Sequence, residues 1–409
     1  MASSPTIIFS VLFLFIFSLS SAQPSIRPKA LLLPVTKDKS TNQYTTVINQ
    51  HYVSSTYRSP RCNSAVCSRA GSTSCGECYS PPRPGCSNNT CGSIPDNTVT
   101  GTATSGEFAT DVVSIQSTNG VNPGRVVKIP NLIFGCGATF LLKGLATGTV
   151  GMAGMGRHNI GLPSQFASAF SFNRKFAVCL NSGRGVAFFG NGPYVFLPGI
   201  QITRLQTTPL LINPVSTASA YSQGDKSTEY FIGVTDIKVA DKSVKFNKTL
   251  LKIDATTGVG GTKLSTVDPY TVMETTIFNA FRLAFVRAAA AMNITRVPSV
   301  KPFGACFSTK NVFGTRVGYA VPNIQLVLHS SDVVWRINGA NSMVSISRDV
   351  ICLGFVDGGV NARTSVVIGG LQLEDNLIEF DLASNRLSFS STLLGLRTNC
   401  ANFNFTSTA

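Results

Sequence analysis

Few residues of this sequence are of the types that carry chemistry, and their spacing excludes several kinds of site. The three histidines, His51, His158 and His329, lie far apart, and no two have the spacing of metal ligands, so we expect no metal centre. The sequence has no Gly-x-Ser-x-Gly nucleophile motif, no phosphate-binding loop and no dinucleotide fingerprint after a strand. Each histidine is therefore interpreted as a surface or structural residue, and no cofactor is predicted.

Cysteine is the second residue type that could carry chemistry, and the number of cysteines is odd. Six cysteines lie between Cys62 and Cys91, where Cys75 and Cys78 form a C-x-x-C that could indicate zinc or redox chemistry. The Pro-, Gly- and Ser-rich context favours a disulfide-knotted loop instead. An odd count predicts one unpaired thiol. The cysteines are Cys62, Cys67, Cys75, Cys78, Cys86, Cys91, Cys136, Cys179, Cys306, Cys352 and Cys400.

The composition indicates a large β-rich protein with a basic surface. The chain has 409 residues, of which 43% are apolar and only 13% charged, which excludes a disordered chain and a coiled coil. Lys and Arg exceed Asp and Glu by 15. Such a charge favours an acidic partner, either an acidic cell-wall polysaccharide or an acidic secreted protein, or it only keeps the protein soluble. Nucleic acid is not expected as a partner.

The N-terminus predicts export. Residues 1–22 have a short apolar core and small residues before Gln23, as a signal peptide does, and the core is too short to cross a bilayer. We therefore expect a secreted protein of the extracellular space or cell wall that does not contact the membrane after cleavage. Four Asn-x-Ser/Thr sequons are candidate glycosylation sites. They begin at Asn88, Asn247, Asn293 and Asn404.

Most of the chain has the pattern of short strands, and two helices interrupt it. Val-, Ile-, Phe- and Thr-rich runs are separated by Gly, Pro, Asn and Asp. Helices are predicted over residues 163–170, which begin with proline, and over residues 271–293, which carry one apolar stripe. The segments VGMAGMGR (150–157) and SVVIGGLQ (365–372) are alike in outline. They suggest a duplication of two β lobes, with a boundary between residues 190 and 209.

A carboxylate pair is the simplest remaining chemistry for a β protein, and here the sequence resembles a known family. Residues 365–390, SVVIGGLQLEDNLIEFDLASNRLSFS, resemble the closing segment of pepsin-like aspartic peptidases. Residues 105–114 and 150–157 resemble first-lobe motifs of that family. GGTKLSTVDPYTVMET (260–275) and the ending TNCANFNFTS are specific to a plant group. That group contains extracellular dermal glycoproteins, xyloglucan-specific endoglucanase inhibitors, xylanase inhibitors and basic seed globulins.

The resemblance implies an all-β, two-lobed fold without catalytic aspartates. The lobes would span residues 23–200 and 201–409. Pepsin-like peptidases need one aspartate from each lobe, and Ser265 occupies the second aspartate position here, where a hydroxyl cannot act as the base. The first catalytic segment is absent, because Gln50 runs directly into His51.

The gap at 50/51 would have structural consequences in the first lobe. In relatives this segment supplies about two strands of the first lobe, so its absence would leave the lobe without them. The lobe is then expected to be destabilised, or the sequence represents a splice variant or a mispredicted gene. In relatives the absent segment carries a cysteine, which implies that Cys136 is the unpaired thiol and that the other ten cysteines form disulfides.

The resemblance also implies a function, inhibition of microbial cell-wall-degrading glycoside hydrolases such as endoglucanases or xylanases. Such enzymes use paired acidic residues, and inhibitory relatives insert arginines between them. The matching residues are Arg316, in FGTRVGYAVP, and Arg397, in GLRTNC. Two alternatives stay open: a basic wall, storage or peptide-binding glycoprotein, and, with least support, an active aspartic endopeptidase. The inhibitory relatives imply a monomer.

Overall fold

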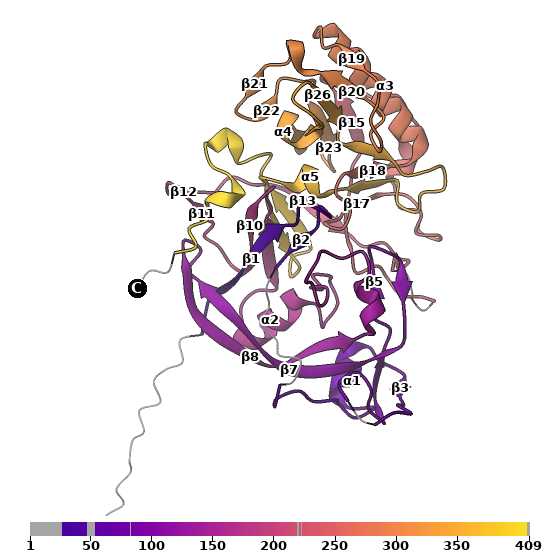
Figure 1. Cartoon of the computed structure of the whole chain (residues 1–409), viewed down its shortest axis with the longest axis vertical. Helices are drawn as coiled ribbons and strands as arrows, with labels where there is room; N and C mark the ends of the chain where they lie inside the picture. The colour runs from indigo at the N-terminus through magenta and orange to yellow at the C-terminus, as the bar shows by residue number, and fades with distance from the viewer. Residues whose placement is uncertain (1–26, 47–53, 82, 219–220, 222, 407–409) are drawn as a thin grey trace, which may run out of the picture.

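The chain forms two β-rich lobes, which Figure 1 shows with the first lobe (indigo to magenta) below the second (orange to yellow). The computed structural model describes residues 27–46, 54–81, 83–218, 221 and 223–406. The predicted signal peptide, the predicted gap at 50/51 and His51 lie outside the described residues. The expectation of an all-β, two-lobed architecture is confirmed.

The first lobe is built on a long antiparallel pair of strands, β7 and β8, which runs from Glu107↔Cys136 to Thr118↔Pro123. Apolar residues alternate along β7, so that Ala109, Val113 and Ile115 are buried on one face. The elements of this part of the chain are β1 (Ala30–Lys37), β2 (Tyr44–Thr45), α1 (Ala65–Ala70), β3 (Cys75–Gly76), β4 (Thr90–Ser93), β5 (Asp96–Asn97), β6 (Thr102–Ala103), β7 (Gly106–Thr118), β8 (Pro123–Cys136), η1 (Thr139–Leu142), α2 (Leu162–Phe170), β9 (Lys175–Cys179), β10 (Arg184–Gly190), β11 (Val195–Phe196) and β12 (Ile200–Gln201).

The second lobe contains more and shorter strands and the longest helix of the described chain, α3. Its elements are β13 (Gln206–Leu211), β14 (Tyr230–Ile232), β15 (Asp236–Val239), β16 (Lys242–Ser243), η2 (Lys248–Leu251), β17 (Thr262–Leu264), β18 (Thr271–Met273), α3 (Thr275–Ala291), β19 (Arg296–Val297), β20 (Cys306–Ser308), η3 (Thr309–Asn311), β21 (Gly314–Thr315), β22 (Gly318–Tyr319), β23 (Ile324–Val327), β24 (Val334–Ile337), α4 (Gly339–Ser342), β25 (Met343–Ser345), β26 (Val350–Leu353), β27 (Phe355–Asp357), β28 (Val366–Ile368), α5 (Gly370–Leu373), β29 (Leu377–Asp381), β30 (Arg386–Phe389), η4 (Leu394–Leu396) and η5 (Cys400–Asn402).

One sheet connects the two lobes. Its strand order is β27-β18-β28-β17-β14-β13-β30-β29-β9-β10-β1-β7-β4-β3, so β29 from late in the chain pairs with β9 from the first lobe. The rings of Phe176 and Phe380 stack across this junction at 4.6 Å. The C-terminal segment also returns to the first lobe, where the Cys179–Cys400 disulfide fixes it. The relative position of the lobes therefore rests on a continuous sheet, a shared core and a covalent bond.

The longer helix begins four residues later than its apolar stripe predicts. Residues 271–273 form strand β18, which pairs with β27 and β28, because Thr and Val suit a pleated, buried surface. Helix α3 starts at Thr275, where the Glu274 carboxylate accepts hydrogen bonds from the N–H groups of Thr276 and Ile277. The predicted stripe is otherwise correct, since Ile277, Phe278, Phe281 and Phe285 are buried. The shorter helix, α2, covers the predicted residues 163–170 and starts one residue earlier.

The two segments that suggested a duplication differ in the structure. In the second lobe, β28 lies between β17 and β18, and its three residues are at most 9% exposed. In the first lobe, residues 150–154 form no strand, and no described strand pairs with them. The side chains of Val150 and Met152 are 78% and 45% exposed. The apolar side chains of this segment thus lie at the surface of the described structure.

Candidate functional site

The turn after β17 begins at Ser265, the residue that the family resemblance places where a catalytic aspartate is expected. The Ser265 amide donates to the carbonyl of Ile368 at 2.9 Å, which joins the end of β17 to β28. The Ser265 hydroxyl accepts hydrogen bonds from the amides of Val267 and Asp268, at 3.1 and 3.3 Å. It therefore closes a tight turn and presents no carboxylate. Asp268 follows Ser265 by three residues, and its backbone carbonyl accepts a hydrogen bond from the Gly370 amide at 2.7 Å.

Glu374, the residue directly after α5, forms an ion pair with a lysine of the first lobe. Lys37 on β1 places its Nζ 2.7 Å from Glu374 Oε1, and the Tyr44 hydroxyl donates to the same oxygen at 2.9 Å. Glu374 is only 7% exposed. Burial, and next the charge of Glu374, raise the pKa of Tyr44 well above its usual range. This carboxylate holds the lobes together and is not free to act as an acid or base on a substrate.

The histidines show no sign of a reactive centre in the described part of the chain. The ring Nδ1 of His329 lies 3.0 Å from Thr208 Oγ1, and burial lowers the pKa of His158. No group of three or more His, Cys, Asp or Glu side chains among the described residues could hold a metal ion.

Arg316 lies at the tip of the exposed β21–β22 hairpin. Thr315 Oγ1 donates to the Gly318 carbonyl at 2.7 Å, and the Val317 carbonyl accepts from the Ala340 amide at 2.8 Å. Gly318 has a φ of 94°, and a Cβ added there would lie 2.0 Å from Ala340 N. The turn thus requires glycine at this position, and it packs directly on α4. The hairpin is a braced support for an arginine that is itself exposed.

Arg397 lies in a second braced loop, directly after η4. Its φ of 63° places a non-glycine residue in the left-handed region, which costs roughly 1–2 kcal/mol. The surrounding structure holds it there, because Leu393 is fully buried and Thr398 Oγ1 donates to the Leu197 carbonyl at 2.8 Å. Cys400, three residues later, is bonded to Cys179. In Figure 1 the yellow C-terminal segment that carries this loop lies on the same side of the view as the β21–β22 hairpin.

Both guanidinium groups are available to a partner. The Arg316 and Arg397 side chains are exposed, and no acidic side chain of the described residues forms an ion pair with either. Phe313, three residues before Arg316, is 79% exposed, which the sequence pattern did not reveal. Aromatic side chains and arginines are the residues that dominate binding energy in protein interfaces.

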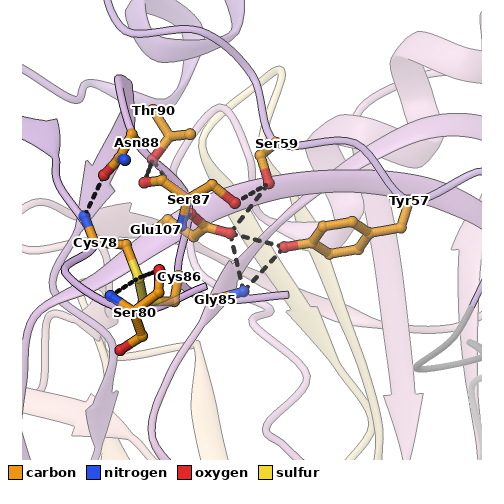
Figure 2. Close-up of a disulfide and its surroundings, with 10 residues drawn as sticks. All are labelled: Tyr57, Ser59, Cys78, Ser80, Gly85, Cys86, Ser87, Asn88, Thr90 and Glu107. Atoms are coloured by element: carbon orange, nitrogen blue, oxygen red, sulfur yellow. Dashed lines mark hydrogen bonds between the residues drawn. A yellow bond between two sulfur atoms is a disulfide. The ribbon is translucent and has the colours of Figure 1, made fainter. Parts of the chain in front are cut away.

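The cysteine-rich region of the first lobe is organised around a buried carboxylate that sequence reasoning missed. Glu107 on β7 is 3% exposed. Figure 2 shows its carboxylate beside the Cys78–Cys86 disulfide, where it accepts hydrogen bonds from five groups. The donors are the hydroxyls of Tyr57, Ser59 and Thr90 and the amides of Gly85 and Ser87, at 2.9–3.2 Å. Its place on the inward face of an alternating strand was the only sequence signal.

Replacing Glu107 by alanine is expected to lower the free energy of unfolding by roughly 2–4 kcal/mol, because five donors lose a charged acceptor. The measurement is denaturant unfolding of purified protein. Glu77→Ala is the matched control, since the exposed Glu77 carboxylate accepts a hydrogen bond from Tyr79 alone among the described residues. Equal stability of the two variants would contradict the assigned role of Glu107.

The structure pairs ten cysteines and leaves one thiol. The disulfides are Cys62–Cys75, Cys67–Cys91, Cys78–Cys86, Cys179–Cys400 and Cys306–Cys352. Cys136, at the end of β8, is free and half-buried, 3.6 Å from the Tyr57 hydroxyl.

Burial raises the pKa of the Cys136 thiol, so it keeps its proton at a pH where an ordinary thiol starts to ionise. We expect iodoacetamide to label one thiol per native chain, more slowly at pH 8 than in the denatured protein, with a rate that still rises above pH 9. Mass mapping of the labelled peptide checks this. A rate equal to that of the denatured chain at pH 8, or label on another cysteine, would be the opposite result.

Most of the predicted glycosylation sites have exposed asparagines. Asn88, Asn247 and Asn293 are exposed and Asn404 is half-buried. Among the described residues, no helix is sufficiently long and apolar to cross a membrane.

Comparison with known proteins assigns both lobes to one family. Residues 33–191 match the family described as "Xylanase inhibitor N-terminal", and residues 229–391 match "Xylanase inhibitor C-terminal". The chain is 56% identical to the "Probable aspartic proteinase GIP2" of Nicotiana benthamiana, over 97% of each chain. That alignment has 427 positions, more than the 409 residues present here, so it includes positions at which this chain has no residue.

Solved structures show the same fold. The structure described as "Crystal structure of edgp" is 56% identical, with a TM-score of 0.92, and the match covers 94% of this chain and 100% of the other. Conglutin gamma, described as a basic 7S globulin from lupine seeds, is 34% identical, with a TM-score of 0.77 over 93% and 100% of the chains. The predicted pepsin-like fold and plant family are confirmed.

Proposed function

The chain belongs to the xylanase inhibitor family of pepsin-like proteins, and we propose that it is a secreted, catalytically inactive member that inhibits microbial cell-wall-degrading glycoside hydrolases. The observation that carries the proposal is the pair of exposed arginines, Arg316 and Arg397, on two braced loops, with no acidic partner among the described residues. Its site of action is the extracellular space or cell wall, and it acts as a monomer.

The proposed mechanism follows from the chemistry of the target. Most glycoside hydrolases place two carboxyl groups on either side of the scissile bond. A guanidinium group can donate two parallel hydrogen bonds to one carboxylate, and it stays charged at any working pH. Because both arginine loops are already ordered, little conformational entropy is lost when they enter the cleft. The inhibitor would thus occupy the space of the substrate and neutralise the acidic pair.

An active aspartic peptidase is the weakest alternative, although the name of the relative from Nicotiana benthamiana includes "aspartic proteinase". A peptidase of this fold needs two carboxylates that share a proton. The turn after β17 presents the Ser265 hydroxyl, which is used to close the turn. Proteolysis that pepstatin blocks would contradict the proposed inactivity.

A second candidate is a basic wall, storage or peptide-binding glycoprotein, which the similarity to conglutin gamma and the net charge of +15 favour. An acidic cell-wall polysaccharide is the partner that this charge would attract. Retention of the protein on pectate without inhibition of any hydrolase would support this candidate.

The test is a titration of the purified protein into fungal enzymes. A xyloglucan-active endoglucanase, a second endoglucanase and a xylanase each receive increasing amounts of inhibitor. We expect at least one activity to fall in proportion to added protein until the two are equimolar. A folded protein that inhibits none of the three would contradict the proposal.

A further inference from the structure

One long stretch of the second lobe carries basic residues without acidic ones. Residues 275–331 contain six Lys or Arg and no Asp or Glu, whereas the whole chain has 19 acidic residues for 34 basic ones. The stretch runs from α3 through β19, β20 and the β21–β22 hairpin into β23, and Figure 1 shows these elements together in the second lobe. Of its basic residues, only Arg316 belongs to the arginine site. The others form a region of positive potential that the proposed inhibition does not use.

Three basic residues come together at one end of the sheet that contains β19, β20 and β26. Arg296 is the first residue of β19, Lys310 lies in η3, directly after β20, and Arg348 lies two residues before β26. Because β20 pairs antiparallel with both neighbours, the start of β19, the end of β20 and the start of β26 lie at the same end of the sheet. Thr309, next to Lys310, also donates its hydroxyl to the Arg348 carbonyl at 3.0 Å. Neighbouring strands are about 5 Å apart, so the three positions span roughly 10 Å.

The charges at this end of the sheet are not compensated within the described residues. Arg296, Lys310 and Arg348 are exposed, and none of them forms an ion pair there. One acidic residue, Asp349, follows Arg348 and leaves an excess of positive charge. Like charges held this close repel one another, and the repulsion lowers the stability of the folded chain. A bound polyanion removes the repulsion, so the arrangement favours a ligand with several negative charges.

We propose that Arg296, Lys310 and Arg348, here named the basic sheet end, bind a linear acidic polysaccharide that carries a carboxylate on each sugar, such as polygalacturonate. In such a polymer the carboxylates repeat with every ring, at a spacing similar to that of neighbouring strands. The long side chains of lysine and arginine can adjust their charged ends to this row of carboxylates. A guanidinium group can also donate two hydrogen bonds to one carboxylate.

This surface would hold the protein in the cell wall while the arginine loops bind an enzyme. It uses neither Arg316 nor Arg397, so the inference goes beyond the proposed inhibition and does not depend on it. Each contact is a solvent-exposed ion pair and is weak by itself. Several contacts along one polymer add up, and salt screens all of them, because the Debye length is only about 8 Å at physiological ionic strength. Binding should therefore be tight at low salt and weak at high salt.

The experiment measures binding of the full secreted protein to immobilised polygalacturonate over a range of salt concentrations. Asn293 begins a sequon and lies three residues before Arg296, so any glycan there is first trimmed to a single sugar with an endoglycosidase. We expect binding that weakens as salt rises, and none to fully methyl-esterified pectin, which has lost the carboxylate charges. In Arg296→Ala/Lys310→Ala/Arg348→Ala the dissociation constant should rise roughly tenfold or more. The slope of log affinity against log salt should fall by about 0.7 for each side chain removed.

A second triple variant, Lys242→Ala/Lys245→Ala/Lys252→Ala, is the matched control. It removes the same charge from exposed positions of the same lobe, around β16 and η2. It should bind polygalacturonate nearly as tightly as the wild type. Both triple variants should keep the wild type's inhibition of an endoglucanase, measured without pectate.

The proposal is overturned if the wild type does not bind polygalacturonate, or if it binds methyl-esterified pectin equally well. It is also overturned if the variant of the basic sheet end binds as tightly as the wild type, or if the two triple variants lose binding to the same extent. Unchanged binding together with lost endoglucanase inhibition would show that this surface contacts the acidic enzyme instead. A wild type that binds polygalacturonate and inhibits no hydrolase would contradict the proposed function alone.

Discussion

Replacing Arg316 and Arg397 together by alanine is expected to weaken inhibition of a susceptible endoglucanase by about 3–5 kcal/mol, or roughly two to four orders of magnitude in the inhibition constant. The physical reason is that each guanidinium would form charge-assisted hydrogen bonds inside a cleft from which water is excluded. The loss also leaves acidic groups of the enzyme without a partner, which adds to the cost. The measurement compares the inhibition constants of the wild type and the double variant, obtained from steady-state rates.

The control for this prediction must remove the same charge from the same lobe. Arg336 and Arg348 are exposed arginines of the second lobe, outside the two braced loops. Arg336→Ala/Arg348→Ala changes the net charge equally, so it should reproduce any effect of long-range attraction alone. We expect that variant to inhibit within a few-fold of the wild type. If the two double variants lose inhibition equally, the arginine loops are not the contact, and the protein acts by its overall charge.

Removing the Cys179–Cys400 disulfide, by replacing both cysteines with alanine, is expected to lower the free energy of unfolding by roughly 2–5 kcal/mol. The two cysteines are 221 residues apart in sequence, so the bond closes a very long loop, and both are fully buried. The bond also fixes the segment that carries Arg397 to the first lobe. Inhibition should therefore weaken as well. The freed loop is no longer ordered before binding, so it loses conformational entropy when the complex forms.

Denaturant unfolding and limited proteolysis measure these two effects separately. New cleavage sites should appear within residues 391–406 of the variant. Cys306→Ala/Cys352→Ala is the comparison, because that bond spans 46 residues inside the second lobe and leaves the C-terminal attachment intact. A Cys179→Ala/Cys400→Ala variant with unchanged stability and no cleavage in this segment would show that the sheet and the core alone hold the C-terminus.

The features that depend on local pattern could be predicted from the sequence. The apolar stripe of α3 and the proline at the start of α2 located both helices, although β18 took the first residues of the longer one. The start was misplaced because Thr271, Val272 and Met273 continue the apolar pattern yet gain more from pairing with β27 and β28. The family resemblance supplied the two-lobed fold, which periodicity alone does not give.

The features that depend on contacts between distant residues could not be predicted. Glu107 and Glu374 are ordinary acidic residues in the sequence, and only the fold brings Tyr57 and Ser87 to one of them and Lys37 to the other. The exposure of Val150 and Met152 likewise depends on which strands are present beside them, since the similar segment of the second lobe is fully paired. Exposure of Arg316 and Arg397 without an acidic partner also required the structure.

The central claim is that the arginine loops enter the acidic active site of a glycoside hydrolase, and the most direct test is the dependence of inhibition on substrate concentration. Initial rates of a susceptible xyloglucan-active endoglucanase are measured over a range of xyloglucan oligosaccharide, at several fixed amounts of the protein. The account predicts competitive inhibition, in which KM rises in proportion to inhibitor while kcat stays constant. A fall in kcat with unchanged KM would contradict it, because the protein would then bind away from the catalytic carboxylates.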